Sequence, residues 1–153
     1  MRLPTTARRT AVAVLLASAL TACGDAAPRE YGTDERAVSV SAGEKFTLQV
    51  PVAGYMGENW YLASPSPDAK VLRYRGKRRK VRGMSDGHEY FDFTAQAAGT
   101  ATVKLLHCPN GLCHSEAEAR AQATRGPSPR PLPTATGTPG DDPEYFVYRV
   151  TVG

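Results

Sequence analysis

The sequence predicts an all-β protein, an immunoglobulin-like β-sandwich of about seven short antiparallel strands. Apolar and polar residues alternate in one segment after another, which is typical of strands that bury one face. Glycine, proline and aspartate separate these segments, and such residues favour turns. Many short strands divided by turns, without a long helix among them, are typical of a two-sheet sandwich.

The first half of the chain predicts four strands. Large apolar side chains alternate on each side of an Ala-Gly-Glu turn at 42–44, namely Val38, Val40, Phe46, Leu48 and Val50. This pattern predicts a strand, a turn and a second strand. Two shorter strands are expected at 60–63 and 71–74, and Trp60 is expected to fill the core of the sandwich.

The second half predicts three more strands and an insertion. Their inward faces are expected to carry Phe91 and Phe93, then Ala101, Val103 and Leu105, and finally Phe146, Tyr148, Val150 and Val152. The segment 115–143 separates the last two strands and begins with a helical turn or two. Residues 127–143 then become rich in proline, threonine and glycine, with too few apolar residues to pack, so 115–143 is interpreted as a low-complexity insertion.

The first 22 residues predict a secretory signal. Three arginines precede a short apolar run that is closed by small residues, and the run is shorter than the roughly 20 residues a spanning helix needs. Leu20-Thr21-Ala22-Cys23 resembles the bacterial lipobox. The resemblance implies cleavage before Cys23 and lipidation of that residue, which would hold the protein on the outer face of the bacterial cell membrane. Ordinary signal cleavage nearby is the alternative.

The remaining chain is expected to be a polar tether at 23–36 and one domain at 37–153. Removal of the three leader arginines lowers the formal net charge from +4 to +1, so the overall charge favours no nucleic-acid partner. One segment departs from this near-neutral overall charge, because residues 73–82 contain seven basic residues in ten. They are interpreted either as a solvated hairpin or as a contact for anionic lipid, cell-wall polymer or an acidic partner.

The stretch HCPNGLCH, residues 107–114, leaves three chemistries open. Cys108 and Cys113 could form a disulfide, bind zinc with His107 and His114, or attach haem. The spacing is longer than the usual C-x-x-C-H haem motif, and haem needs a large apolar pocket. Outside the cytoplasm a disulfide is favoured over free thiolates. No Ser/His/acid set or phosphate-binding glycine loop is recognisable, so neither an enzyme nor a cofactor is expected.

The frame VSVSAGEKFTLQVPV, GENWYL, FDFTAQAAGTATVKLL and FVYRVTV resembles the chagasin-like inhibitors of papain-family cysteine peptidases. The resemblance covers most of residues 37–152 apart from the insertion. It implies a seven-stranded immunoglobulin-like sandwich in which three loops at one end wedge into the peptidase cleft. The lipid bilayer, through Cys23, and a papain-like cysteine peptidase are then the expected partners.

The predicted strand segments match this family better than the predicted loops match it. The resemblance places the inhibitory loops at three sets of positions, which are Ala53, Gly54, Tyr55, Met56 and Gly57; Gly83, Met84, Ser85, Asp86 and Gly87; and Cys108, Pro109 and Asn110. Gly57 and Trp60 fall on the family's glycine and tryptophan. Tyr55 and Met56 replace two threonines that are expected to meet the peptidase, and only Pro109 remains of the family's Arg-Pro-Trp.

The two cysteines therefore fall in the third loop. A Cys108–Cys113 bridge would replace the missing arginine and tryptophan as the constraint on the loop's shape, or would be a local staple without a partner. The sequence favours a membrane-tethered peptidase inhibitor. An envelope-binding module that has lost inhibition, and a structural lipoprotein without a specific ligand, are the alternatives.

Overall fold

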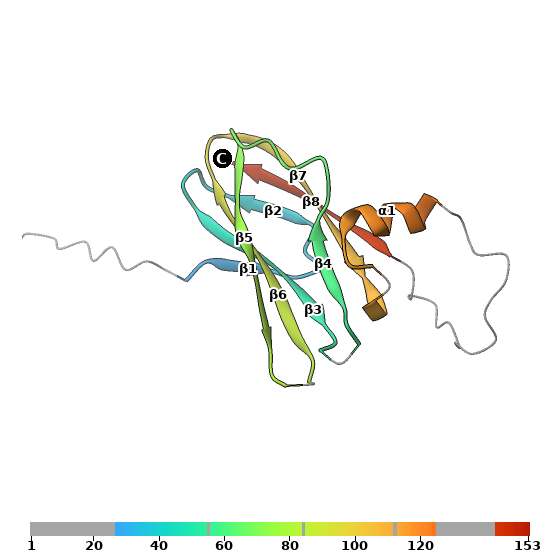
Figure 1. Cartoon of the computed structure of the whole chain (residues 1–153). Coiled ribbons are helices and arrows are strands. Elements are labelled where there is room, and N and C mark those ends of the chain that lie inside the picture. The colour runs from blue at the N-terminus through green and yellow to red at the C-terminus, as the bar shows by residue number, and fades with distance from the viewer. Residues whose placement is uncertain (1–26, 55, 84, 112, 125–142) are drawn as a thin grey trace, which may run out of the picture.

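The computed structural model describes residues 27–54, 56–83, 85–111, 113–124 and 143–153, which form a two-layer β-sandwich (Figure 1). The first sheet has the order β1-β3-β6-β5, made of Arg29–Tyr31, Lys45–Val52, Gly87–Ala95 and Leu72–Val81. The second sheet has the order β2-β8-β7-β4, made of Ala37–Val40, Glu144–Val152, Gly99–Cys108 and Asn59–Leu62. The predicted all-β sandwich is confirmed.

The core lies between the sheets and is formed by the residues whose alternation predicted it. All the large apolar side chains expected to point inward are buried except Phe146, which is half-buried and packs against them. Phe46 of β3 stacks on Phe93 of β6, with ring centroids 5.5 Å apart. Each fully buried side chain of this size stabilises the fold by roughly 1.5–3 kcal/mol, so the alternation itself specifies the register.

The predicted turn at 42–44 joins two strands of different sheets. β2 pairs with β8, whereas β3 pairs with β1 and β6, so the turn crosses from one layer to the other. Backbone hydrogen bonds hold this corner, since the Gly43 amide donates to the Ala95 carbonyl and the Ala42 amide donates to the Gly153 carbonyl. The local alternation of apolar residues predicts both strands, but it does not predict which sheet each strand joins.

The structure corrects the expected strand number, strand direction and tether. There are eight strands in the described chain, and β1 and β2 each pair in parallel, with β3 and β8 respectively. β1 lies inside the segment 23–36 that was expected to be a tether. Three residues are too few to show an alternation, and β1 buries only Tyr31, whose hydroxyl donates to the Ser39 carbonyl at 3.3 Å.

The basic run 73–82 is a strand rather than a hairpin tip. Nine of its ten residues belong to β5, which pairs along its length with β6. The register shifts between Tyr74 and Gly76, as at a β-bulge. Beyond this shift Lys77 and Arg79 lie opposite Phe91 and Glu89, whose side chains are buried. Two of the seven cations are therefore directed into the sandwich.

One helix, α1 (Glu116–Thr124), covers part of the outer face of the second sheet. Its Ala119 packs in a small buried cluster with Ala63, Leu106 and the two cysteines. Ser115 caps the helix by accepting from the Glu118 amide at 3.2 Å, and the Glu118 carboxylate accepts from the His114 amide at 2.7 Å. The helical turn or two expected after residue 115 is thus present.

The signal segment 1–22, Cys23, the start of the tether, Tyr55, Met84 and residues 125–142 of the insertion lie outside the described residues. Within the part of the chain that is described, no helix has the length and apolar character needed to cross a membrane.

Candidate functional site: three loops at one end of the sandwich

Three connections that are distant in the sequence meet at one end of the sandwich. We call 53–57 the first loop, 83–88 the second loop and 107–113 the third loop, and together they form the loop edge. β3 and β6 are paired at Val52 and Gly87, so the first and second loops leave side by side. β4 and β7 are paired at Asn59 and Cys108, which brings the third loop to the same end. The expected gathering of the loops is confirmed.

Two glycines allow the loops to approach closely. A Cβ atom added at Gly54 would lie 2.4 Å from the Ser85 carbonyl oxygen, which is too close for any side chain. A Cβ atom at Gly57 would lie 3.5 Å from the Gly111 Cα, and Gly57 has a φ of +70°, a left-handed conformation that favours glycine. The close approach of the first loop to the second therefore requires glycine at Gly54, whereas at Gly57 it is the backbone conformation that favours glycine.

The exposed part of the loop edge is smaller than the sequence predicts. Met56 is 41% exposed, and Gly57, Gly83, Ser85 and Asp86 are exposed as well. Ala53, Gly54, Gly87 and Asn110 are half-buried. Cys108 and Pro109 were expected among the contact residues, but both are buried and cannot meet a partner. Their place in the third loop is structural, because they anchor its base in the protein.

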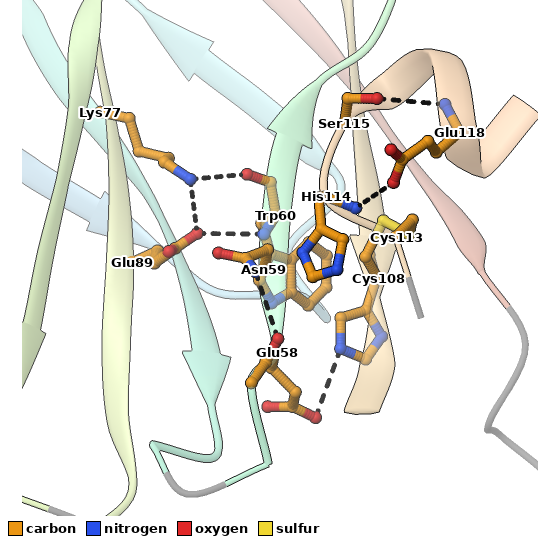
Figure 2. Close-up of a disulfide and its surroundings, with 12 residues drawn as sticks. Glu58, Asn59, Trp60, Lys77, Glu89, Cys108, Cys113, His114, Ser115 and Glu118 are labelled. Carbon is orange, nitrogen blue, oxygen red and sulfur yellow. Dashed lines mark hydrogen bonds and ion pairs between the residues drawn. A yellow bond between two sulfur atoms is a disulfide. The ribbon is translucent and has the colours of Figure 1, made fainter. Parts of the chain in front are cut away.

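The third loop is closed by a Cys108–Cys113 disulfide, as expected from its sequence (Figure 2). The two Cα atoms are 5.6 Å apart, and both cysteines are fully buried. The bridge packs with Ala63, Leu106 and Ala119, so it also connects the loop to α1. Both sulfur atoms are used in the bridge, which excludes the thiolate zinc site and the haem attachment. No cluster of three metal-binding side chains is present among the described residues.

Glu58 closes the first loop. Its carboxylate accepts from the Ala53 amide at the start of the loop, and its own carbonyl accepts from Arg79 Nη1 at 2.8 Å. Arg79 belongs to β5, so an edge strand of the first sheet holds the end of the loop. The loop is therefore fixed at both ends by hydrogen bonds, which reduces the conformational entropy that binding would cost.

A buried carboxylate lies beneath the first loop. Glu89 of β6 is 1% exposed and lies 3.2 Å from Lys77 Nζ and 3.1 Å from Arg79 Nη1. It also accepts from the Trp60 amide at 3.1 Å, and Lys77 donates to the Trp60 carbonyl at 2.8 Å (Figure 2). We call Glu89, Lys77 and Arg79 the ionic network. It joins β5 and β6 of the first sheet to β4 of the second.

The ionic network is not among the sequence-based predictions, although one signal in the sequence indicates it. In HEYFDF, Glu89 falls on the same alternation as Phe91 and Phe93, so a carboxylate is expected on the buried face. A buried carboxylate needs cations or donors to offset its lost hydration. Two lysine or arginine residues of the basic run at inward positions supply them.

Trp60 and His107 form the floor of the loop edge. Trp60 is buried, as predicted, and its Nε1 donates to the Pro51 carbonyl at 2.9 Å. His107, the first residue of the third loop, is still part of strand β7, and it stacks on Trp60 with ring centroids 4.3 Å apart. Its Nε2 lies 3.4 Å from a Glu58 carboxylate oxygen. Burial lowers the pKa of His107, and the neighbouring Glu58 opposes this only in part.

An open hollow of about 610 Å³ adjoins this floor. Residues of the first and second loops line it, together with Glu58, His107, Glu144 and Phe146. At this end of the protein, the hollow is concave and the exposed tips of the first two loops project beside it. Such a surface is suited to binding another molecule by shape and hydrogen bonding.

Comparisons with known proteins identify this architecture at the level of the fold. No protein-family model matches the sequence, and no curated protein is detectably similar to it. Among solved structures, the cysteine protease inhibitor EhICP2 from Entamoeba histolytica is similar with a TM-score of 0.50 and 12% identity, over 82% of this chain and 94% of that one. PbICP-C, solved in complex with falcipain-2, is similar with a TM-score of 0.50 and 8% identity, over 82% of this chain and 91% of that one. The chain thus has the immunoglobulin-like fold of these proteins.

Proposed function

We propose that the protein inhibits papain-like cysteine peptidases, with the loop edge occluding the active-site cleft. The observation that carries the proposal is the meeting of three loops at one end, in a fold that a named cysteine protease inhibitor shares. The first and second loops supply the exposed tips, which include Met56, Ser85 and Asp86. The third loop supplies a rigid flank closed by its disulfide.

Inhibition in this proposal needs no chemical step in the inhibitor. The first loop is held before binding by Glu58 and the ionic network, and the third loop by the disulfide, so less ordering of these two loops remains to oppose association. Exposed Met56 offers a flexible apolar contact, a side-chain type that adapts to irregular surfaces. Rigid loops of matching shape give tight complexes in protease–inhibitor pairs of standard interface size.

The proposal includes a lipid anchor at Cys23 on the outer face of the cell membrane. The lipobox-like LTAC at the end of the apolar run supports it. Expression of the full chain in a bacterium with a radiolabelled fatty acid tests it. Label should enter the wild-type protein and be lost in Cys23→Ala, whereas equal labelling of both would contradict the anchor.

A second candidate is a binding module of the same fold that recognises another envelope component. It is favoured by Met56 in place of a threonine and by the burial of Cys108 and Pro109, which removes them from any contact. Titration of papain with a protein of residues 24–153 separates the two. Inhibition in the nanomolar range supports the inhibitor, and no inhibition at tens of micromolar favours the binding module.

A further inference from the structure

The outer face of the first sheet carries most of the cations of the basic run. Arg73, Arg78 and Lys80 lie opposite Thr94, Tyr90 and His88, which alternate with the fully buried Glu89, Phe91 and Phe93. Arg75 and Arg78 also line a hollow on this face together with Lys45 of β3, and the same hollow contains Asp92, which pairs with Arg78. We call Lys45, Arg73, Arg75, Arg78 and Lys80 the basic face.

Few carboxylates balance the basic face. Asp92 pairs with Arg78 at 2.9 Å, and Glu30 of β1 lies near enough to act on Arg78 electrostatically. In the described chain, Arg73, Arg75 and Lys80 have no acidic partner. On the outer side of the second sheet, the described cations are Lys104 and Arg149 of the strands and Arg120 of α1, which pairs with Glu116. The positive charge is therefore concentrated on one layer of the sandwich.

The chain enters the fold beside this face. β1 begins at Arg29, opposite Phe46 at the start of β3, and Pro28 lines the hollow of about 320 Å³ with Lys45, Arg75 and Arg78. Only residues 24–28 separate Cys23 from β1. At about 3.3–3.6 Å per residue this segment spans roughly 20 Å at most. An anchor at Cys23 would hold this hollow within about that distance of the membrane, at the end of β5 where Arg73 lies rather than Lys80.

The entry point of the chain also lies away from the loop edge. β1 runs parallel to β3, and β3 runs from Lys45 toward the first loop. The chain therefore enters at the end of the sheet away from the loops, and an anchored protein keeps its loops clear of the attachment point.

We infer that the basic face docks on an anionic lipid surface, with phosphate headgroups at the hollow that Lys45, Arg75 and Arg78 line. The inference rests on the proposed anchor at Cys23, which places the face next to the headgroups and makes the contact effectively intramolecular. Each cation near an anionic surface raises membrane association by a factor of about five. The three cations without acidic partners would together contribute about a hundredfold.

Co-sedimentation with vesicles tests the surface without the anchor. The described core lies within residues 31–152, so a protein of residues 24–153 retains it. At low salt, vesicles of phosphatidylcholine alone are compared with vesicles that contain equal amounts of phosphatidylcholine and phosphatidylglycerol. We expect binding to the anionic vesicles only, and its loss in about 0.5 M salt, where charges are screened.

Two charge-matched variants locate the contact. R75Q/K80Q should lower the partition onto anionic vesicles more than tenfold. K104Q/R149Q removes the same two residue types from the other sheet and should bind as the wild type does. Equal losses in both variants, or no preference for anionic vesicles, would overturn the inference. So would saturable binding of soluble diphosphate without vesicle binding, since this would indicate a small-anion site.

Papain inhibition measured on the same preparations keeps this inference separate from the proposed function. R75Q/K80Q should inhibit as well as the wild type, because neither residue belongs to the loop edge. Vesicle binding without inhibition would refute the peptidase proposal alone, and inhibition without vesicle binding would refute the membrane surface alone.

Discussion

Arg79 Nη1 lies 3.1 Å from the buried carboxylate of Glu89 and 2.8 Å from the Glu58 carbonyl that ends the first loop. One guanidinium thus joins the charged interior of the sandwich to the candidate binding loop. The stability of the fold and the shape of the loop edge are coupled through this contact.

Removal of the cations of the ionic network should destabilise the protein strongly. K77M/R79M leaves Glu89 buried without a counter-charge, and loss of a partner from a buried pair costs about 3–5 kcal/mol. Urea unfolding should show this as a lower midpoint. R78Q breaks the exposed pair with Asp92 and should cost less than about 1 kcal/mol. Equal effects of the two variants would contradict a stabilising role for the network.

A Gly54→Ala substitution should disrupt the loop edge while leaving the two-sheet core folded. The added methyl group overlaps the Ser85 carbonyl, so the first and second loops must separate. We expect at least a tenfold weaker inhibition of papain, as for a loss of about 1.4 kcal/mol of binding energy. Gly43→Ala is the control, because it adds backbone strain at a φ of +84° in a turn that meets no neighbour and lies away from the loops. Its inhibition should be unchanged.

Loss of the disulfide should loosen the third loop. Replacement of both Cys108 and Cys113 by alanine removes a bridge across five residues of sequence, and closure of so short a loop contributes about 2 kcal/mol. Differential scanning calorimetry should show a lower Tm. Inhibition should weaken if the loop flanks the peptidase. Unchanged stability would mean that α1 and its packing hold the loop without the bridge.

The pH dependence of stability should contain a contribution from His107. Burial lowers the pKa of His107 in the folded protein below its ordinary value of 6.5, so the unfolded chain takes up a proton first as the pH falls. The free energy of unfolding should therefore decrease as the pH falls below about 6.5, until the folded protein is also protonated. His107→Gln should remove this part of the profile. An identical slope in the variant would assign it to other groups.

Tyr148 offers a test of a polar group in the core. Its side chain is fully buried, its hydroxyl has no hydrogen-bond partner among the described residues, and burial raises its pKa to about 12. Tyr148→Phe should increase stability by about 1 kcal/mol, since it removes an unpaired polar atom. Tyr31→Phe loses the bond to Ser39 and should decrease stability. A decrease in both variants would show that the Tyr148 hydroxyl has a partner.

Sequence periodicity predicted most of the fold for a physical reason. A strand that buries one face must alternate, so Phe46, Leu48, Phe91 and Phe93 indicate both the element and its orientation. The direction of a strand, and the pairing of a short strand at the edge of a sheet, produce no alternation in the sequence. For this reason the sequence predicts a tether where β1 lies, and it does not predict the parallel pairing of β1 and β2.

The candidate site was predicted in part, for a related reason. The resemblance to the chagasin-like inhibitors located the three loops, and the expected export favoured the disulfide. Exposure within the loops depends on packing with distant residues, as when Pro109 is buried at the base of the third loop. The ionic network likewise depends on the inward positions of Lys77 and Arg79, which the bulge near Gly76 sets.

The most direct test of the central claim is the inhibition constant of residues 24–153 against papain, measured for the wild type, Gly54→Ala and Gly43→Ala. If the loop edge occludes the peptidase, the wild type and Gly43→Ala should inhibit equally in the nanomolar range, and Gly54→Ala should be much weaker. Absence of inhibition by the wild type, or a loss through Gly43→Ala instead of Gly54→Ala, would contradict it.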